Sequence, residues 1–174
     1  MQTPISFRPL GRSDFPLLQE WLSAPHVVAW WHEPLDLASV TAKYGPRVDG
    51  TEPTRVFVIE HAGRPIGWIQ WYLWSDYPEH AVQLGAELSS AGIDLAIGEL
   101  AMTGLGLGPV AIREFLRQIV FADASVSAVI TDPEESNLGS LRAFQKAGFT
   151  VTSTAQLAGE KFNRRVVRMD RQSS

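Results

Sequence analysis

The most informative stretch of this sequence reads Thr103-Gly-Leu-Gly-Leu-Gly-Pro-Val-Ala-Ile-Arg-Glu-Phe-Leu-Arg-Gln-Ile-Val120. Three glycines at alternate positions precede Pro109, which suits a first helical position because its missing N–H would have no partner there. Glycine lets the backbone approach a ligand closely, and free N–H groups at a helix N-terminus attract negative charge. The stretch predicts either a pyrophosphate-binding loop or a plain glycine-rich turn that opens an amphipathic helix.

Two common phosphate-binding patterns do not fit this stretch. A Walker loop requires Gly-Lys-Ser/Thr, and none follows here. A dinucleotide fold requires an acidic residue at the end of a second strand roughly 20 residues further on. Asp123 falls in that window, but it lies in a loop-like Ala-Asp-Ala-Ser segment.

The segment downstream supports the phosphate-binding interpretation. Residues 125–131 are typical of a strand, and residues 132–149 predict a turn, a helix and a C-terminal cap at Gly148. Together with the glycine loop they resemble GNAT acetyltransferases, in which a Gln/Arg-x-x-Gly-x-Gly loop binds the pyrophosphate of CoA and a strand-Asn-helix-Gly-Phe unit supports the pantetheine arm. Gly106, Gly108 and Asn137 match these motifs, whereas Thr103 stands where the family has Gln or Arg.

The remainder of the chain alternates strand-like and helix-like segments. Strands are predicted at residues 5–10, 55–60, 65–74 and 92–98, with a turn at 61–64 that makes the second and third a hairpin. Helices are predicted after Ser13-Asp14, near His26, and from Asp36 to a stop at Gly45-Pro46, and residues 75–91 are expected to be irregular. We expect one α/β domain over residues 1–174. The resemblance implies a GNAT fold, a strongly twisted, mainly antiparallel sheet of six or seven strands with helices on both faces.

Composition narrows the range of partners. The chain has 174 residues, and 15 Lys and Arg against 19 Asp and Glu give a net charge of −4. This balance argues against nucleic acid as a partner and favours a cationic small molecule. No apolar run approaches the ~20 residues of a membrane span, and the first residues lack the apolar stretch of a signal peptide, so we expect a cytoplasmic protein.

Metal and disulfide chemistry are not expected. The sequence has no cysteine, and its four histidines are scattered without a compact ligand motif. His26 and His32 lie six residues apart, which favours a structural or substrate-contacting role. Whether the protein is a monomer or a homodimer stays open at this level.

A closer resemblance, from about Phe15 to Phe149, is to the aminoglycoside 6′-N-acetyltransferases. Short strings carry it: Glu20-Trp-Leu, His26-Val-Val-Ala-Trp-Trp31, Arg64-Pro-Ile-Gly-Trp, Gly92-Ile-Asp94, Gly104-Leu-Gly-Leu-Gly108, Thr131-Asp-Pro and Ser136-Asn-Leu. The resemblance implies that Asp94 lies beside the reacting amine and that Asp132 helps to hold the cationic substrate, with Glu87 as a third acidic group. Carboxylates suit this task because charge-assisted hydrogen bonds to ammonium groups give both affinity and orientation.

The implied reaction is direct transfer of the acetyl group from the co-substrate acetyl-CoA to the amine. Asp94, directly or through water, is the candidate base, and its alternative is a solvated carboxylate at a strand end. Backbone N–H groups near Ile97 and Gly98 are expected to stabilise the oxyanion. Many GNAT enzymes protonate the leaving thiolate with a tyrosine, but Phe144 stands at that position. Either the thiolate leaves unassisted, or Tyr72 or a water supplies the proton.

Two larger sets of residues complete the candidate site. The expected CoA contacts are Ile97, Gly98, Thr103, Gly104, Leu105, Gly106, Leu107, Gly108 and Asn137. The expected substrate contacts are Trp30, Trp31, Trp71, Trp74, Glu87, Asp94 and Asp132. The four tryptophans are equally compatible with stacking on sugar rings and with packing in the core.

Three functions therefore remain open. The first is acetylation of the 6′-amine of an aminoglycoside, which would give antibiotic resistance. The second is acylation of another small amine or of a siderophore intermediate. The third is an acyl-CoA-binding domain without turnover, which the departures at Thr103 and Phe144 favour.

Overall fold

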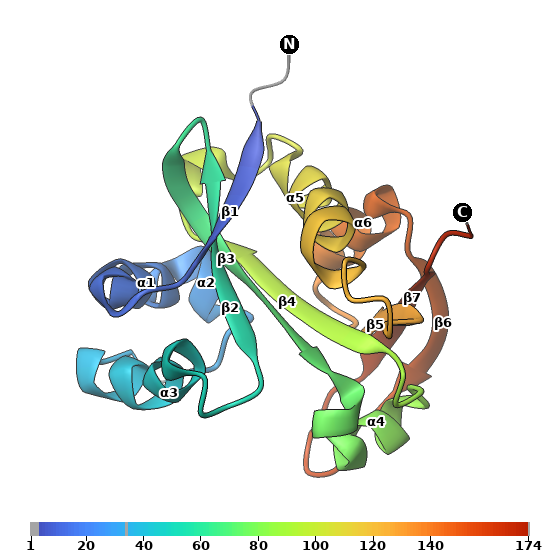
Figure 1. Ribbon diagram of the computed structural model, residues 1–174. Helices are drawn as coiled ribbons and strands as arrows, with labels where there is room; N and C mark the ends of the chain where they lie inside the picture. Colours follow the sequence, from blue (N-terminus) through green and yellow to red (C-terminus); the bar gives the residue numbers. More distant parts are fainter. Residues whose placement is uncertain (1–3, 34, 174) are drawn as a thin grey trace. The chain divides into compact units, whose positions relative to one another are not determined.

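The computed structural model describes residues 4–33 and 35–173, and it contains one mixed sheet with helices (Figure 1). The strands are β1 (Ile5–Pro9), β2 (Arg55–His61), β3 (Arg64–Leu73), β4 (Ala91–Ile97), β5 (Ala128–Thr131), β6 (Thr150–Ala155) and β7 (Arg164–Asp170). They are ordered β1-β2-β3-β4-β5-β7-β6. The β4–β5 pair is parallel, and the β1–β2, β5–β7 and β6–β7 pairs are antiparallel. The predicted α/β class is confirmed, with seven strands in the part of the chain that the structure describes.

The helices fill the intervals between the strands. The α-helices are α1 (Phe15–Ser23), α2 (Pro25–Val28), α3 (Leu37–Asp49), α4 (Pro78–Leu84), α5 (Leu107–Phe115) and α6 (Leu138–Ala147). The short 3₁₀ helices of the described residues are η1 (Arg12–Asp14), η2 (Trp74–Asp76) and η3 (Leu100–Met102), and a π-helical turn, η4 (Leu116–Val120), extends α5. No helix within residues 4–33 and 35–173 is both long enough and apolar enough to cross a bilayer.

Internal contacts divide the chain into two compact units. Unit 1 comprises Met1–Gln70 and Asp94–Gly108, and unit 2 comprises Trp71–Ile93 and Pro109–Ser174. The boundaries fall inside β3 and β4, so each of these strands contributes residues to both units. The single domain expected from sequence stays a prediction.

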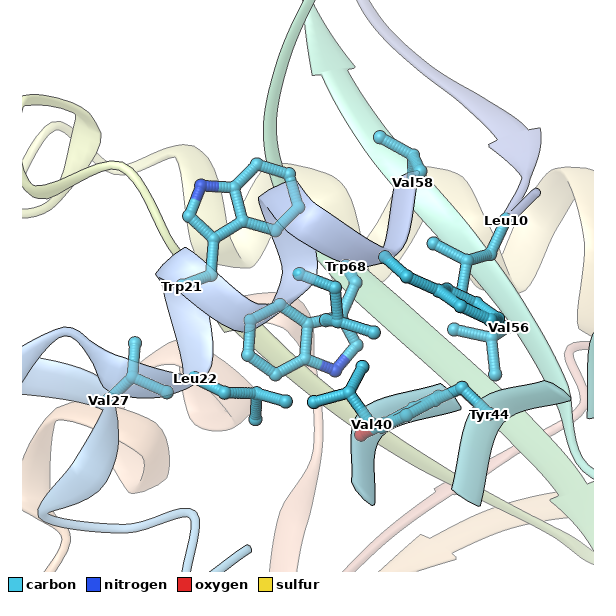
Figure 2. Packing of buried hydrophobic residues seen from close by; sticks show 11 residues of the cluster. Leu10, Trp21, Leu22, Val27, Val40, Tyr44, Val56, Val58 and Trp68 are labelled. Carbon is cyan, nitrogen blue, oxygen red and sulfur yellow. The ribbon is translucent and has the colours of Figure 1, made fainter. Parts of the chain in front are cut away.

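The core of unit 1 is built around Trp68 of β3 (Figure 2). Its indole stacks on Trp21 of α1 with ring centroids 6.0 Å apart and meets the edge of Trp31 at 5.0 Å. Aromatic pairs of this kind stabilise a fold by about 0.5–1.5 kcal/mol beyond the burial of their surface. This contact explains why α1 shows apolar residues at helical spacing: Leu18, Trp21 and Leu22 all face the same cluster.

The core of unit 2 gathers around Trp74, which begins η2. Trp74 is completely buried, and its Nε1 donates a hydrogen bond to the carbonyl oxygen of Ile130 at 3.0 Å. Ala81 and Leu84 of α4 pack into the same cluster. A buried indole thus satisfies its one polar atom while it joins η2, α4 and β5.

The expected end of α3 at Gly45-Pro46 is wrong. The helix continues through Pro46 to Asp49 and ends at Gly50, whose φ of 79° is left-handed. A proline clashes with the Cβ atom of the residue before it, but Gly45 has none. Arg12 packs on Gly45 and pairs with Asp49 at 2.6 Å, so the last turn is held from outside the helix.

The expectation of an irregular segment at residues 75–91 is also wrong, because α4 lies inside it. The helix begins at Pro78, has Glu79 in its first turn and ends at Gly85, which has a φ of 67°. Proline at the start of a helix and glycine after its end are common boundary residues, so the sequence did mark both ends of α4. The helix is too short to show a hydrophobic period.

The other expected elements are confirmed with shifted boundaries. The hairpin of β2 and β3 turns at Ala62 and Gly63, both with positive φ. Helix α5 begins at Leu107, two residues before Pro109, so this proline lies within the first turn, where its missing N–H still leaves no bond unmade. Strand β5 is shorter than residues 125–131 and starts at Ala128.

Candidate active site

Asp94 lies on β4 in unit 1 and is half-buried. Its Oδ2 accepts a hydrogen bond from Nε2 of Gln70 at 3.0 Å. Gln70 is only 7% exposed, and its Oε1 accepts from Nη1 of Arg47 at 2.9 Å. The predicted base is therefore a carboxylate whose orientation is fixed by a buried amide.

Gln70 and Arg47 are missed when the sequence is read alone. Gln70 interrupts the apolar run Ile66-Gly-Trp-Ile-Gln-Trp of β3. A polar side chain in a buried strand needs hydrogen-bond partners, so its position was a usable signal. The identity of those partners depends on β4 and α3, which are distant in sequence.

The glycine loop also belongs to unit 1 and follows η3. Gly104 and Gly106 have φ values of 71° and 77°, and a Cβ atom added to either would have no atom within 4 Å. The backbone is thus left-handed and open to a ligand at both positions, immediately before α5 begins. Thr103 donates from Oγ1 to the carbonyl oxygen of Leu100 at 2.6 Å, and Leu105 is 63% exposed. Leu107 and Gly108 are half-buried in the first turn of α5.

The C-terminal end of β4 carries the residues expected to stabilise an oxyanion. The N–H of Gly98 donates to the carbonyl oxygen of Ile66 at 2.8 Å, so the structure does not offer it to a substrate oxygen. The oxyanion role of Gly98 stays a prediction, and it would require this N–H to exchange the carbonyl oxygen of Ile66 for a substrate oxygen. The carbonyl oxygen of Ile97 lies 2.9 Å from Nε2 of His26, which must carry its proton on this nitrogen to donate.

Asp132 lies in unit 2, directly after β5, and is 5% exposed. Its Oδ2 lies 3.0 Å from Nε2 of His80 and 3.8 Å from Nη1 of Arg164. Arg164 also donates to the backbone oxygen of Asp132 at 3.0 Å. The carboxylate expected to hold a cationic substrate is therefore already paired inside the protein, through two residues that sequence alone did not connect to it.

Glu87 is likewise paired within unit 2. Both of its carboxylate oxygens accept from Nη1 of Arg168 at 2.7 Å. These hydrogen bonds hold the pKa of Glu87 below its usual range. Glu87 is more than one third exposed, so this pair lies at the surface.

The four tryptophans fall into two groups. Trp71 is 3% exposed and Trp74 is fully buried, which favours the packing interpretation of both over stacking on a substrate. Trp31 is half-buried against Trp68, and Trp30 is 38% exposed. Trp30 thus keeps the most accessible ring of the four.

The second GNAT-like motif forms as expected in unit 2. Asn137 caps α6 by accepting from the N–H of Ser140 at 3.1 Å, and Gly148 ends the helix with a φ of 109°. Phe144 is 3% exposed and meets Phe149 edge-on at 5.1 Å. Asn137 therefore has a structural task of its own, and Phe144 has no group that can give up a proton.

No group of three His, Asp or Glu side chains that could hold a metal ion is found in the part of the chain that the structure describes. The titratable residues of the candidate site are instead engaged in hydrogen bonds and ion pairs with nitrogen donors, as Asp94, Asp132 and Glu87 are.

Comparison with known proteins bears directly on these features. Residues 11–157 match the model of an acetyltransferase (GNAT) domain. The chain is 30% identical over 156 residues to aminoglycoside N(6′)-acetyltransferase type 1 of Klebsiella pneumoniae, which covers 83% of this chain and 73% of that protein. Lysine N-acyltransferase MbtK of Mycobacterium sp. (strain MCS) is 23% identical over 159 residues, covering 91% of this chain and 64% of that protein.

Among solved structures, the chain is similar to the aminoglycoside acetyltransferase AAC(6′)-Ib in complex with coenzyme A and kanamycin. The TM-score is 0.81 at 28% identity, and the match covers 97% of this chain and 95% of that one. GNAT acetyltransferases use acetyl-CoA as the acetyl donor, and this solved relative has coenzyme A bound. The chain therefore belongs to the GNAT family of acetyltransferases and is related to the aminoglycoside 6′-N-acetyltransferases.

Proposed function

We propose that this chain, acting as a single GNAT domain, transfers an acetyl group from acetyl-CoA to a primary amine of a cationic small molecule. The first candidate is the 6′-amine of an aminoglycoside, as in the relatives named for that reaction. The observation that carries the proposal is Asp94, a half-buried carboxylate on β4 with one oxygen fixed by Gln70. Such a group is suited to receive a proton from an ammonium.

Acetyl-CoA supplies a thioester, which is an activated acyl donor. The loop at residues 104–108 fits its pyrophosphate, because Gly104 and Gly106 combine left-handed backbone with open space on the side where a side chain would stand. Free N–H groups in the first turn of α5 would donate to the phosphate oxygens. Thr103 provides no positive charge for the pyrophosphate, so the loop would bind this group chiefly through its backbone N–H groups.

Asp94 would act by deprotonating the substrate amine, directly or through a water. A protonated amine has no lone pair, so it cannot attack a thioester until the proton is removed. Trp30, which lies in the same unit as Asp94, remains a candidate contact of the acceptor. Because Phe144 cannot donate a proton, the thiolate would leave unassisted or receive a proton from Tyr72 or water, and the reference thiol pKa of ~8.5 makes the unassisted route tolerable.

A second candidate acceptor is a small amine that carries fewer positive charges, such as the side chain of lysine. Asp132 is paired with His80 and Arg164, and Glu87 is paired with Arg168. Arg164 and Arg168 each offset part of a negative charge that an aminoglycoside would otherwise meet. The similarity to a lysine N-acyltransferase supports this candidate as well.

The test is release of the CoA thiol from acetyl-CoA in the presence of kanamycin, tobramycin, lysine or a linear diamine. The aminoglycoside assignment predicts the highest kcat/KM with kanamycin or tobramycin, and mass spectrometry should place the acetyl group on the 6′-nitrogen. A higher kcat/KM with lysine would replace it by the second candidate. Thiol release with none of these amines, together with measurable binding of acetyl-CoA, would favour the non-catalytic alternative.

A further inference from the structure

A chain of hydrogen bonds leads from helix α3 to Asp94 within unit 1. Arg47 donates from Nη1 to Oε1 of Gln70 at 2.9 Å, and Gln70 donates from Nε2 to Oδ2 of Asp94 at 3.0 Å. Arg47 is itself held at two further points. Its Nε lies 3.3 Å from Oε2 of Glu52, and its guanidinium carbon lies 5.3 Å from the ring centroid of Tyr44.

The direction of this chain is fixed by chemistry. A guanidinium has only donors, so the carbonyl end of the Gln70 amide must face Arg47. The NH₂ end is then left to face Asp94, and an ionised carboxylate can only accept. A flipped amide would set a donor against Arg47 and an acceptor against Asp94, so both bonds would be lost together. Gln70 is nearly fully buried, which leaves little water to replace them.

Arg47 also belongs to a partly buried cluster of charged and polar side chains. Tyr44 donates from its hydroxyl to Oε2 of Glu33 at 2.8 Å, and Lys43 pairs with Oε1 of the same carboxylate. Burial is the main reason why the pKa of Tyr44 is raised well above its usual range, and the negative charge of Glu33 is the next. The positive charge of Arg47 lowers this pKa, whereas the negative charge of Asp94 raises it further. Among these described groups, Tyr44 interacts electrostatically with Asp94, and Arg47 reaches Asp94 through Gln70.

We infer that Arg47 is a positioning residue for Asp94, and that it acts by setting the orientation of the Gln70 amide. The inference rests on the proposed function of Asp94 as the base that takes the amine proton. Without Arg47, the Gln70 amide is free to rotate and Asp94 loses its fixed donor. A base that is displaced or reoriented loses rate even when the substrate still binds, because proton transfer requires hydrogen-bond reach and alignment.

The test combines a measurement on Asp94 that needs no substrate with a kinetic one. The variants are Arg47→Met, which keeps a long apolar stem without donors, and Gln70→Leu, which removes the amide. Arg47→Lys restores a donor and a positive charge. Glu52→Gln is the matched control, because it removes the exposed partner of Arg47 and leaves the bond to Gln70 in place. Each folded variant is titrated by carbon NMR of the Asp94 carboxylate and assayed for kcat and both KM values.

The positioning role predicts that Arg47→Met and Gln70→Leu both raise the midpoint of the Asp94 titration, because each removes stabilisation of its charged form. We expect kcat to fall about tenfold in each, with the KM for acetyl-CoA unchanged. The double variant should lose no more than the worse single variant, since the two residues act in series. Arg47→Lys should recover part of kcat, and Glu52→Gln should match the wild type.

Unchanged titration and unchanged kcat in folded Arg47→Met would overturn the inference. Full additivity in the double variant would also contradict it, because the arginine would then act independently of Gln70. If Arg47→Met does not fold, Gln70→Asn breaks the same chain by shortening the amide side chain, and the same two outcomes apply. If the wild type acetylates no amine, the proposed function fails, whereas the NMR titration still decides whether Arg47 and Gln70 control Asp94.

Discussion

A Cβ atom on Gly98 would lie 2.1 Å from Cγ of Trp21, so the indole occupies the space that a side chain at residue 98 would need. The φ of Gly98 is not positive, which means that packing and not backbone conformation requires glycine here. Trp21 is also anchored to the next residue, since its Nε1 donates to Oε1 of Glu99 at 2.8 Å. The end of β4 and helix α1 are therefore fitted to each other inside unit 1.

We expect Gly98→Ala to destabilise the protein, because the new methyl group must push a buried indole out of the core. Overpacking of this kind costs about 1–3 kcal/mol. Gly139→Ala is the matched control: it lies in α6, its nearest Cβ contact would be 3.9 Å away, and alanine there should stabilise the helix by up to ~1 kcal/mol. The measurement is the free energy of unfolding in urea. Equal free energies of unfolding for the two variants would show that Trp21 can shift to accommodate the methyl group at little cost.

Gly106→Val should weaken binding of CoA sharply while the fold survives. A side chain at a φ of 77° is strained, and it would stand where the loop is open to the ligand. Gly50→Val provides the control, because Gly50 has a φ of 79° with the same open surroundings but caps α3. Isothermal calorimetry with CoA should show a loss of affinity in the first variant alone. If the two variants bind CoA equally well, the loop at 104–108 is not the pyrophosphate site.

The glycine loop and the α6 motif could be predicted because each depends on residues that are close together in the sequence. Gly104, Gly106 and Gly148 adopt positive φ at the expected places, and Asn137 caps the N-terminus of α6. Helix α4 could be found only from Pro78 and Gly85, since seven residues are too few to show a period. The end of α3 was predicted wrongly at Pro46. A proline disfavours helical backbone at the residue before it partly through a clash with that residue's Cβ atom, and Gly45 has no Cβ atom.

Asp132→Asn should raise the KM for kanamycin by roughly tenfold while it lowers kcat less, because binding in both the ground and transition states is lost. Added salt should raise the wild-type KM in the same direction. His80→Gln is the comparison variant. Removing this partner of Asp132 should not raise the KM for kanamycin and could lower it, because the carboxylate itself is kept. Steady-state kinetics at two salt concentrations give the answer. A KM that responds neither to salt nor to Asp132→Asn would exclude the polycation as the ligand of this carboxylate.

Asp14 should contribute stability that is lost in acid. Arg8 donates to both of its oxygens at 2.8 and 2.9 Å, and this ion pair holds the pKa of Asp14 below its usual value. A depressed carboxylate pKa gives stability that is fully present above the unfolded value of ~3.9 and lost as the pH falls through the folded value. Urea midpoints of wild type and Asp14→Asn should therefore differ at pH 7, and this difference should shrink as the pH falls below about 4 and vanish below the lowered pKa of Asp14. A gap that stays constant with pH would assign the effect to packing.

The partners of the site carboxylates could not be predicted from the sequence. Gln70 lies 24 residues from Asp94, His80 lies 52 residues from Asp132, and Glu87 lies 81 residues from Arg168. Each pair depends on how strands and helices distant in sequence pack together, which no local pattern encodes. The family resemblance therefore predicted the carboxylates themselves, whereas only the fold revealed that Asp132 and Glu87 each lie against an arginine.

Whether Asp94 takes the amine proton is decided by turnover against pH for the wild type and Asp94→Asn. Asparagine keeps the size and hydrogen bonding of the side chain but has no basicity, and a general base is typically worth ~100- to 10,000-fold in rate. With one accepted aminoglycoside, followed by release of the CoA thiol, kcat of the variant should fall at least about 100-fold with CoA affinity nearly unchanged. Rising pH should partly rescue the variant but not the wild type, because hydroxide then deprotonates the amine. A variant with wild-type rates at neutral pH would remove Asp94 from the chemistry.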